Sequence, residues 1–236
     1  MRRILGVIAC AACAVPAAAQ QQRLQFTAGG GAFQEIVQSH VDSNNSRFTG
    51  LLLGAEGSLV SDRFIIRLRY AEGKVNPRNA SIPSGGGGAL ANVLHGTAAA
   101  AAVDSAPRDV VEGEALVGFR ALPWLTLWAG PSARAYTVGD ANQRWLIWSG
   151  RASVRGTLLP GRMQTFLELW GALSGNVGNP PVSASGRGAD GGLELRLGEA
   201  AAFWGRLGYR IQSTHAEGLR ETVESLTLSL VYGLPQ

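Results

Sequence analysis

The sequence predicts an all-β fold, in which about ten strands close into an antiparallel transmembrane β-barrel after an N-terminal signal peptide. Two stretches, 124–138 and 144–159, carry most of this prediction because apolar and polar residues alternate along both. A period of two is typical of strands, whose successive side chains point to opposite faces. Each stretch has one uncharged apolar face and one face with arginine, and each exceeds the roughly 5–6 residues usual for a strand. The five-residue link 139–143 joins them as a hairpin.

The N-terminus has the pattern of a secretory signal peptide. Arg2 and Arg3 precede an apolar run over residues 4–19, and three alanines stand directly before Gln20. We therefore predict a signal peptide at 1–19 and one β-barrel domain at 20–236. A membrane anchor is one alternative, although the run is too short and too rich in alanine to favour it. A lipoprotein signal is another, since residues 7–10 resemble a lipobox.

Removal of this leader excludes several functions. Cys10 and Cys13 both lie within it, so the mature chain would have neither a disulfide nor a catalytic thiol. The formal net charge falls from +4 to +2, because Arg2 and Arg3 leave and no acidic residue does. A charge that small argues against a nucleic-acid partner. The remaining chain of about 217 residues fits one large β domain.

Ten strands are predicted, with links that alternate in length. The expected strands are 23–35, 47–60, 63–75, 109–121, 124–138, 144–159, 164–176, 188–198, 202–215 and 221–234. Short turns are expected at 61–62, 122–123, 160–163 and 199–201, and mostly longer loops at 36–46, 76–108, 139–143, 177–187 and 216–220. Barrels of the outer membrane have short periplasmic turns and longer external loops. An even number of strands would place both chain ends on the periplasmic side.

The aliphatic face of the strands is predicted to face lipid. It lacks charge through the middle of most strands, as in Leu51 and Leu53, Leu167 and Leu169, or Leu226 and Leu228. Aromatic residues on this face lie mostly near strand ends, where rings suit the boundary between lipid and water: Tyr70, Phe119, Trp148, Phe203, Tyr209 and Tyr232. The strands are also long enough for a tilted crossing, which needs about 9–11 residues. A soluble barrel or sandwich, with this face buried, is the alternative.

The opposite face then fills the lumen with charges of both signs. The predicted lumen acids are Glu56, Glu112, Glu114, Glu168, Asp190 and Glu194, and the bases are Arg67, Arg69, Arg120, Arg134, Arg151, Arg155, Arg196, Arg206 and Arg210. Neighbouring strands predict pairs of Glu56 with Arg67 and Arg69, these with Glu112 and Glu114, Glu168 with Arg151 and Arg155, and Glu194 with Arg206. A packed polar core is favoured over a selectivity lining, because side chains still nearly fill a barrel of this size. On this assignment Leu169 faces lipid and Ser174 faces the lumen.

With this pattern the chain resembles small outer-membrane β-barrel proteins of Gram-negative bacteria, over the leader and all ten strands. Residues 225–234 resemble the C-terminal insertion signal of that class, with Tyr232 in the place of a terminal aromatic residue. The resemblance implies export through the periplasm to the outer membrane. It also implies contact with outer-membrane lipid and lipopolysaccharide, and with the barrel assembly machinery during insertion. It implies no cofactor, and it leaves the oligomeric state open.

Two enzyme families share this scaffold, and the sequence departs from both. Omptin proteases pair two Asp with an Asp–His couple, but this chain has neither Asp-x-Asp nor Asp-x-His. Lipid A deacylases carry His-x-Ser-Asn, whereas here His40, Ser43 and Asn44 are spaced one residue further apart. On a strand, residues three apart point to opposite faces, so a base at 40 would not reach a hydroxyl at 43. We expect His40 and His95 in loops and His215 at a strand end, without the spacing of a metal site.

Three hypotheses for the function follow. The first is a barrel with a largely packed, charged lumen and a structural or surface ligand-contacting role. The second is a narrow channel for small solutes, leaning towards anions because the predicted lumen bases outnumber the acids. The third is an outer-membrane hydrolase. The sequence favours the first, and it predicts no catalytic, cofactor-binding or metal-binding residue.

Overall fold

The computed structural model describes residues 24–41, 44–78, 106–138, 141–178, 181–198 and 202–233. The predicted signal peptide lies outside these residues. The described chain forms ten strands: β1 (Gln25–Val41), β2 (Asn44–Ser61), β3 (Phe64–Pro77), β4 (Arg108–Leu122), β5 (Leu125–Val138), β6 (Ala141–Leu159), β7 (Met163–Val177), β8 (Val182–Arg196), β9 (Phe203–Ala216) and β10 (Leu219–Tyr232). No helix in the described ranges is long and apolar enough to cross a membrane.

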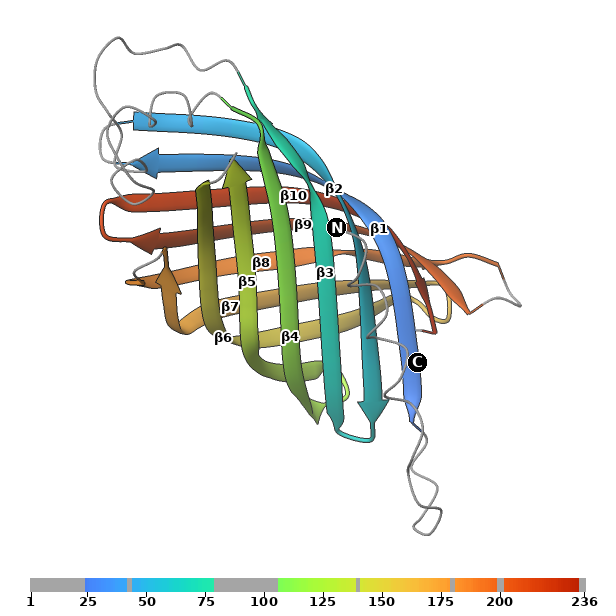
Figure 1. Ribbon diagram of the computed structural model, residues 1–236. Coiled ribbons are helices and arrows are strands. Elements are labelled where there is room, and N and C mark those ends of the chain that lie inside the picture. Colours follow the sequence, from blue (N-terminus) through green and yellow to red (C-terminus); the bar gives the residue numbers. More distant parts are fainter. Residues whose placement is uncertain are drawn as a thin grey trace, which may run out of the picture.

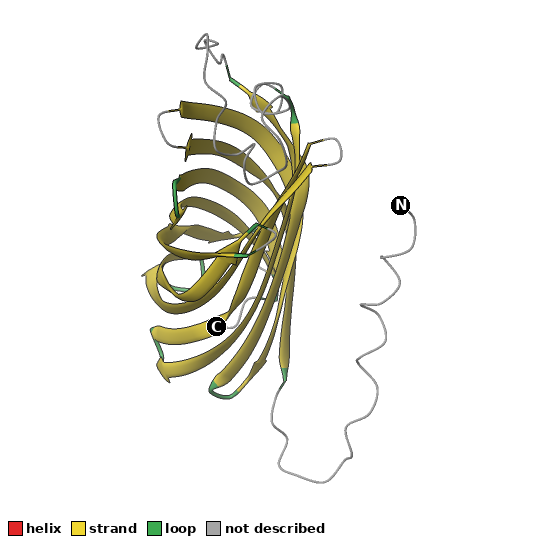
Figure 2. Ribbon diagram, turned by 60° about the vertical axis from the view of Figure 1, so that its left-hand side comes forward, coloured by secondary structure: helices red, strands yellow, loops and turns green. Residues whose placement is uncertain are grey.

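The ten strands form one closed barrel, as the sequence predicts. Each strand pairs with the next along the chain, and β1 closes the ring against β10 (Figures 1 and 2). Every pairing is antiparallel; at the closure, for example, Gly30 lies opposite Leu230 and Gln34 opposite Leu226. Closure gives each strand a partner on both sides, so the sheet has no edge to expose to lipid.

The links between strands differ from the prediction at one end of the barrel. Two residues separate β2 from β3 and β4 from β5, as expected. At the opposite end, however, two residues also separate β1 from β2, β5 from β6 and β9 from β10. The expected longer loops there are instead strand, because the alternation continues through Val37, Ser39 and Val41. The β3–β4 segment remains long, and its end of the barrel is called the outer end, since outer-membrane barrels carry their longer loops outside.

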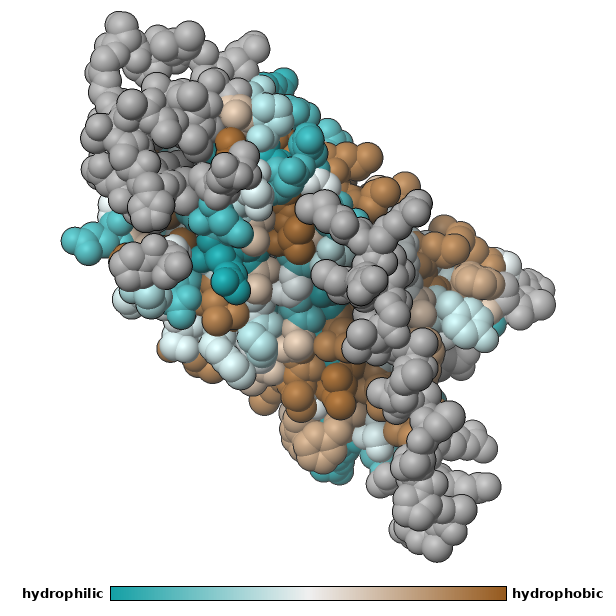
Figure 3. Space-filling view, viewed as in Figure 1, coloured by the Kyte–Doolittle hydropathy of each residue, from teal (hydrophilic) through white to brown (hydrophobic). Residues whose placement is uncertain are grey.

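The aliphatic face points outwards, which confirms the predicted assignment. Leu53, Leu169 and Leu228 are among many large apolar side chains exposed on the outer wall. Aromatic pairs mark the belt towards the inner end: Phe64 packs against Phe119 and Phe203 against Tyr232, with ring centroids 5.6 and 5.2 Å apart. In Figure 3 the hydrophobic side chains gather towards the inner end, and hydrophilic ones towards the outer end. Such a belt matches a lipid bilayer.

A bulge in β7 reverses the predicted face of one residue. Trp148 of β6 pairs with Ser174, but the next residue, Ser149, pairs with Ala172, so Leu173 is an extra residue in β7. One extra residue inverts the alternation beyond it. Ser174 is therefore exposed beside the outward-facing Trp148, and its predicted place in the lumen is wrong.

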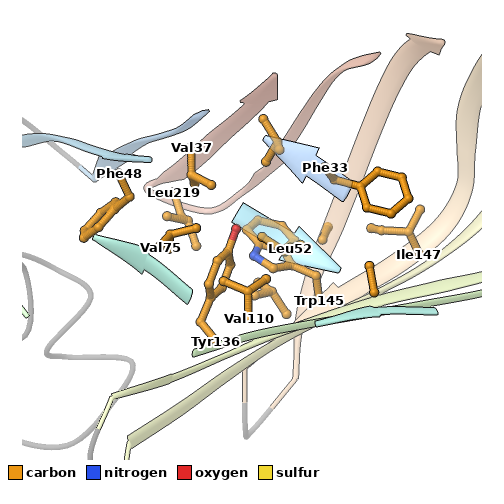
Figure 4. Packing of buried hydrophobic residues seen from close by; sticks show 14 of the residues in the cluster. Phe33, Val37, Phe48, Leu52, Val75, Val110, Tyr136, Trp145, Ile147 and Leu219 are labelled. Carbon is orange, nitrogen blue, oxygen red and sulfur yellow. The ribbon is translucent and has the colours of Figure 1, made fainter. Parts of the chain in front are cut away.

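The outer half of the lumen contains a hydrophobic core that the sequence analysis did not predict. Val37, Phe48, Leu52, Val75 and Val110 have no exposed surface and form one cluster with Trp145, Ile147, Leu219 and Val223 (Figure 4). Several come from stretches that are apolar on both faces, such as 51–53 and 110–111. In these stretches one set of apolar side chains meets lipid and the other fills the barrel.

Candidate functional site

Most of the predicted lumen charges lie in three groups of ion pairs stacked within the barrel. The outer ion cluster comprises Arg134, Glu35, Glu112 and Glu221; the middle ion cluster comprises Arg67, Arg151, Glu114 and Glu168; the inner ion cluster comprises Arg155, Arg206, Glu56 and Glu194. Asp190 and Arg210 form a separate pair, with Nη2 and Oδ2 3.2 Å apart.

In the outer ion cluster one arginine contacts three carboxylates. Arg134 is buried, and its guanidinium pairs with Glu35, with Glu112 at 2.7 Å and with Glu221 at 4.0 Å. Tyr136 extends the cluster by donating a hydrogen bond to Glu221 at 2.8 Å. The hydrophobic cluster packs around these groups, so water screens them little and each charge depends on its partners.

The middle ion cluster joins two arginines and two glutamates in a closed set. Arg67 donates two hydrogen bonds of 2.9 Å to Glu168 and contacts Glu114 at 3.2 Å. Arg151 contacts the same two acids, at 2.6 Å from Glu114 and 3.1 Å from Glu168. The guanidinium of Arg67 also stacks over Trp128, 4.6 Å from the ring centroid. This bidentate, stacked geometry is specific to arginine.

The inner ion cluster is also balanced, with two bases and two acids. Glu194, which is completely buried, accepts hydrogen bonds from Arg206 at 2.8 Å and from Arg155 at 3.2 Å. Arg206 also pairs with Glu56 across the lumen. Arg155 is the most accessible member, with 40% of its side chain exposed.

Several predicted pairs are wrong, although the residues themselves lie in the lumen. Arg155 pairs with Glu194 rather than Glu168, and Glu56 pairs with Arg206 rather than Arg67 or Arg69. The predicted pairs lie on neighbouring strands, whereas long side chains in a narrow barrel reach across it. Three predicted residues have other surroundings: Arg69 stacks over Phe33, Arg120 lines a cavity at the inner end, and Arg196 ends β8.

The sequence analysis missed two acids of the outer ion cluster. The sequence pattern predicts Glu35 as the last residue of the first strand and Glu221 as the first residue of the last. Glu35 is in fact in the middle of β1, opposite Gly50, and Glu221 is paired with Ser39 within the sheet. The continuing alternation from Phe33 to Val41 was the signal that would have placed Glu35 in the lumen.

The space left in the lumen is unevenly distributed. A cavity of about 730 Å³, called here the inner vestibule, opens at the inner end and is lined by turn residues such as Arg63 and Trp124. Beyond it, two cavities of about 60 Å³ each lie among the ion clusters. A water needs at least 10–15 Å³, by order of magnitude, so these small cavities have room for a few waters each.

The two described histidines, His40 and His215, lie on the outer wall near the outer end rather than in the lumen. His40 is on β1, not in the predicted loop, and its Nδ1 contacts Asn45. His215 is near the end of β9, as predicted, and its Nε2 lies 2.8 Å from Ser185 Oγ. Ser43 and His95 lie outside the described residues. Among the described residues no three His, Cys, Asp or Glu side chains are grouped to hold a metal.

Comparison with known proteins identifies the fold. The outer-membrane protease OmpT of Escherichia coli superposes with a TM-score of 0.55 at 8% identity, covering 92% of this chain and 99% of that one. An outer-membrane channel of Pseudomonas putida F1 gives a TM-score of 0.46 at 11% identity, covering 93% and 99%. No protein-family model and no curated protein sequence matches the chain.

The chain has the fold of small outer-membrane β-barrel proteins, and its place is the outer membrane. The closed ten-strand ring and the outward apolar belt provide the physical reason for this location. The outer-membrane protease OmpT shares this fold at 8% identity. Fold alone therefore leaves the activity to be argued from the lumen and the wall.

Proposed function

We propose that this protein is a non-conducting outer-membrane barrel with a largely packed, charged lumen, and that it acts through its wall and its outer end in a structural or surface ligand-contacting role. The observation that carries the proposal is the filling of the outer lumen. Val37, Phe48 and Val75 are fully buried there, and Arg134 is held by three carboxylates in the same half.

A narrow channel for anions is the alternative, and the packing argues against it. A conducting path needs continuous water, whereas the cavities among the ion clusters, beyond the inner vestibule, have volumes of about 60 Å³ each. To open a path, an ion would have to separate the charges of the middle ion cluster. Losing one partner of a buried pair costs about 3–5 kcal/mol, which opposes such opening.

Planar-bilayer recording tests this proposal. We expect refolded wild-type protein to give no discrete current steps in concentrated potassium chloride. The variant Phe48→Ala/Tyr136→Ala/Trp145→Ala, which lacks three large side chains of the hydrophobic core in the outer lumen, should give small current steps. The matched control, Leu53→Ala/Trp148→Ala/Tyr209→Ala, changes the outer wall and should remain silent. Stable unitary steps from the wild type would overturn the closed-lumen proposal in favour of a channel.

Contact with lipopolysaccharide and with the assembly machinery stays a prediction. Its support is the outer wall near the outer end, where exposed polar residues such as Arg47, Lys74 and Arg220 follow the apolar belt. The contact between Ser185 and His215 is the feature that comes nearest to supporting a hydrolase role. This pair faces outwards from the barrel, away from the lumen charges, and His215 pairs in the sheet with Arg220 rather than with an acid.

A further inference from the structure

The inner vestibule differs from the packed outer half of the lumen in its charge and in the residues that line it. Among the described residues that line it, five are arginines (Arg63, Arg67, Arg120, Arg155 and Arg206), and Glu56 is the one acid. A cavity of about 730 Å³ is within the size range of small-molecule sites, approximately 300–1,000 Å³.

The ion clusters account for three of the five arginines. Arg67 belongs to the middle ion cluster, where two arginines meet two glutamates. Arg155 and Arg206 belong to the inner ion cluster, which is likewise balanced. Arg63 and Arg120 remain, and neither one belongs to an ion cluster. Together they add two positive charges to the lining of the vestibule.

The backbone holds these two arginines side by side. The amide of Arg120 donates a 2.7 Å hydrogen bond to the carbonyl of Arg63, which links the β2–β3 turn to the end of β4. Both side chains line the same cavity, Arg63 from an exposed turn and Arg120 from a half-buried strand position. Two guanidinium groups on one rim can donate several hydrogen bonds to a carboxylate or a phosphate.

The other residues that line the vestibule suit the apolar part of an organic ligand better than they suit an inorganic ion. Trp124 and Trp128 contribute indole rings, and Val60, Ile65 and Leu122 add aliphatic surface. Thr27 and Ser58, hydrogen bonded to each other at 2.6 Å, lie among them. Apolar walls with a few convergent polar groups are typical of small-molecule sites.

We propose that the inner vestibule binds a small organic anion, with a carboxylate or phosphate at Arg63 and Arg120 and an apolar body against Trp124 and Trp128. The site opens at the inner end, so the ligand comes from the periplasm. Because the lumen beyond it is packed, the vestibule acts as a closed-ended binding site rather than as the entrance to a channel. This proposal is independent of any role of the outer end.

Calorimetric titration of the full chain, refolded in an uncharged sugar detergent, tests the site. The probes are phenyl phosphate, benzoate, inorganic phosphate and phenol. We expect saturable binding of phenyl phosphate and benzoate, weaker binding of inorganic phosphate, and none of phenol. Arg63→Gln/Arg120→Gln should weaken phenyl phosphate binding about tenfold or more, since each charged hydrogen bond contributes strongly.

The control variant loses the same charge elsewhere. Arg47→Gln/Arg144→Gln removes two exposed arginines near the outer end and should bind phenyl phosphate as the wild type does. Arg63→Gln alone changes an exposed turn, so it keeps the test informative if the double variant does not fold. The proposal is overturned if the wild type binds neither organic anion, or if the Arg63 variants and the control bind equally well.

Discussion

The two halves of the lumen are built by the same ten strands but are filled in different ways. In the outer half, Val37 and Phe48 pack as in a soluble protein, and Arg134 is enclosed by three acids. In the inner half, Arg63 and Arg120 face a cavity of about 730 Å³. An inward position in this barrel therefore does not by itself determine the free-energy cost of a charge. The cost depends on how far the surrounding side chains exclude water.

The largest expected effect is a difference in unfolding free energy between variants of two arginines, one in each half of the lumen. Arg134→Gln should lower the free energy of unfolding by about 5 kcal/mol, because it leaves buried carboxylates without their cation. Arg120→Gln, in the inner vestibule, should change it by less than about 0.5 kcal/mol. Urea unfolding in lipid vesicles measures both. Equal losses would mean that the vestibule is as tightly packed as the outer half.

A second test concerns the middle ion cluster, between the two halves. Glu168→Gln should lower the free energy of unfolding by about 3 kcal/mol, because Arg67 and Arg151 both lose a carboxylate partner. Adding Arg151→Gln should recover part of this loss. Adding Arg155→Gln should recover none, because Arg155 pairs with Glu194. Thermal unfolding of the three variants in detergent decides; recovery with Arg155→Gln alone would contradict the observed pairing.

A third test sets the lumen against the lipid face on one strand. Leu169 of β7 is exposed on the outer wall, whereas Gln164 of the same strand lines the inner vestibule. Leu169→Arg should cost about 2–4 kcal/mol near the middle of the bilayer, and Gln164→Arg should cost little. The yield of folded protein in vesicles, read from heat-modifiable gel mobility, compares them. Similar yields would contradict the assignment of Leu169 to the lipid face and of Gln164 to the lumen.

The smallest expected effect concerns space rather than charge. A Cβ atom at Gly118 would lie 2.4 Å from the Trp128 ring, over which Arg67 is stacked. Gly118→Leu should therefore destabilise the barrel by about 1–3 kcal/mol through overpacking. At Gly113, on the same strand, an added Cβ meets nothing within 4 Å, so Gly113→Leu is the control. Unfolding midpoints that agree for both variants would contradict the tight contact with Trp128.

The sequence was sufficient for the strands and the closure, because a period of two is a local property that each segment shows separately. Ten segments with an apolar outer face were predicted and are present. The bulge at Leu173 was not predictable in this way, since one extra residue leaves the composition of β7 unchanged while reversing the face of Ser174. Apolar stretches such as 51–53 were also ambiguous, because both of their faces are hydrophobic.

The pairing of lumen charges required information that alternation does not contain. Arg206 reaches Glu56, 150 residues away in sequence, and Arg67 reaches Glu168, 101 residues away. Such contacts depend on the curvature of the sheet and on the length of each side chain. The inner vestibule was missed for a related reason: it arises where turns at 62–63 and 123–124 leave the barrel unfilled, and neither turn has a distinctive motif.

The strands continue well beyond the apolar belt at the outer end. On β3 the outward-facing residues change from Tyr70 to Glu72, Lys74 and Asn76 before the strand ends at Pro77. Seven residues of a tilted strand span roughly 15–20 Å, so the barrel wall extends above the lipid surface by about that distance. A peptide tag inserted between Pro77 and Arg108 would then be attached above the lipid headgroups. Antibodies added to intact cells should reach that tag, whereas a tag in the β2–β3 turn should be labelled only after the outer membrane is permeabilised.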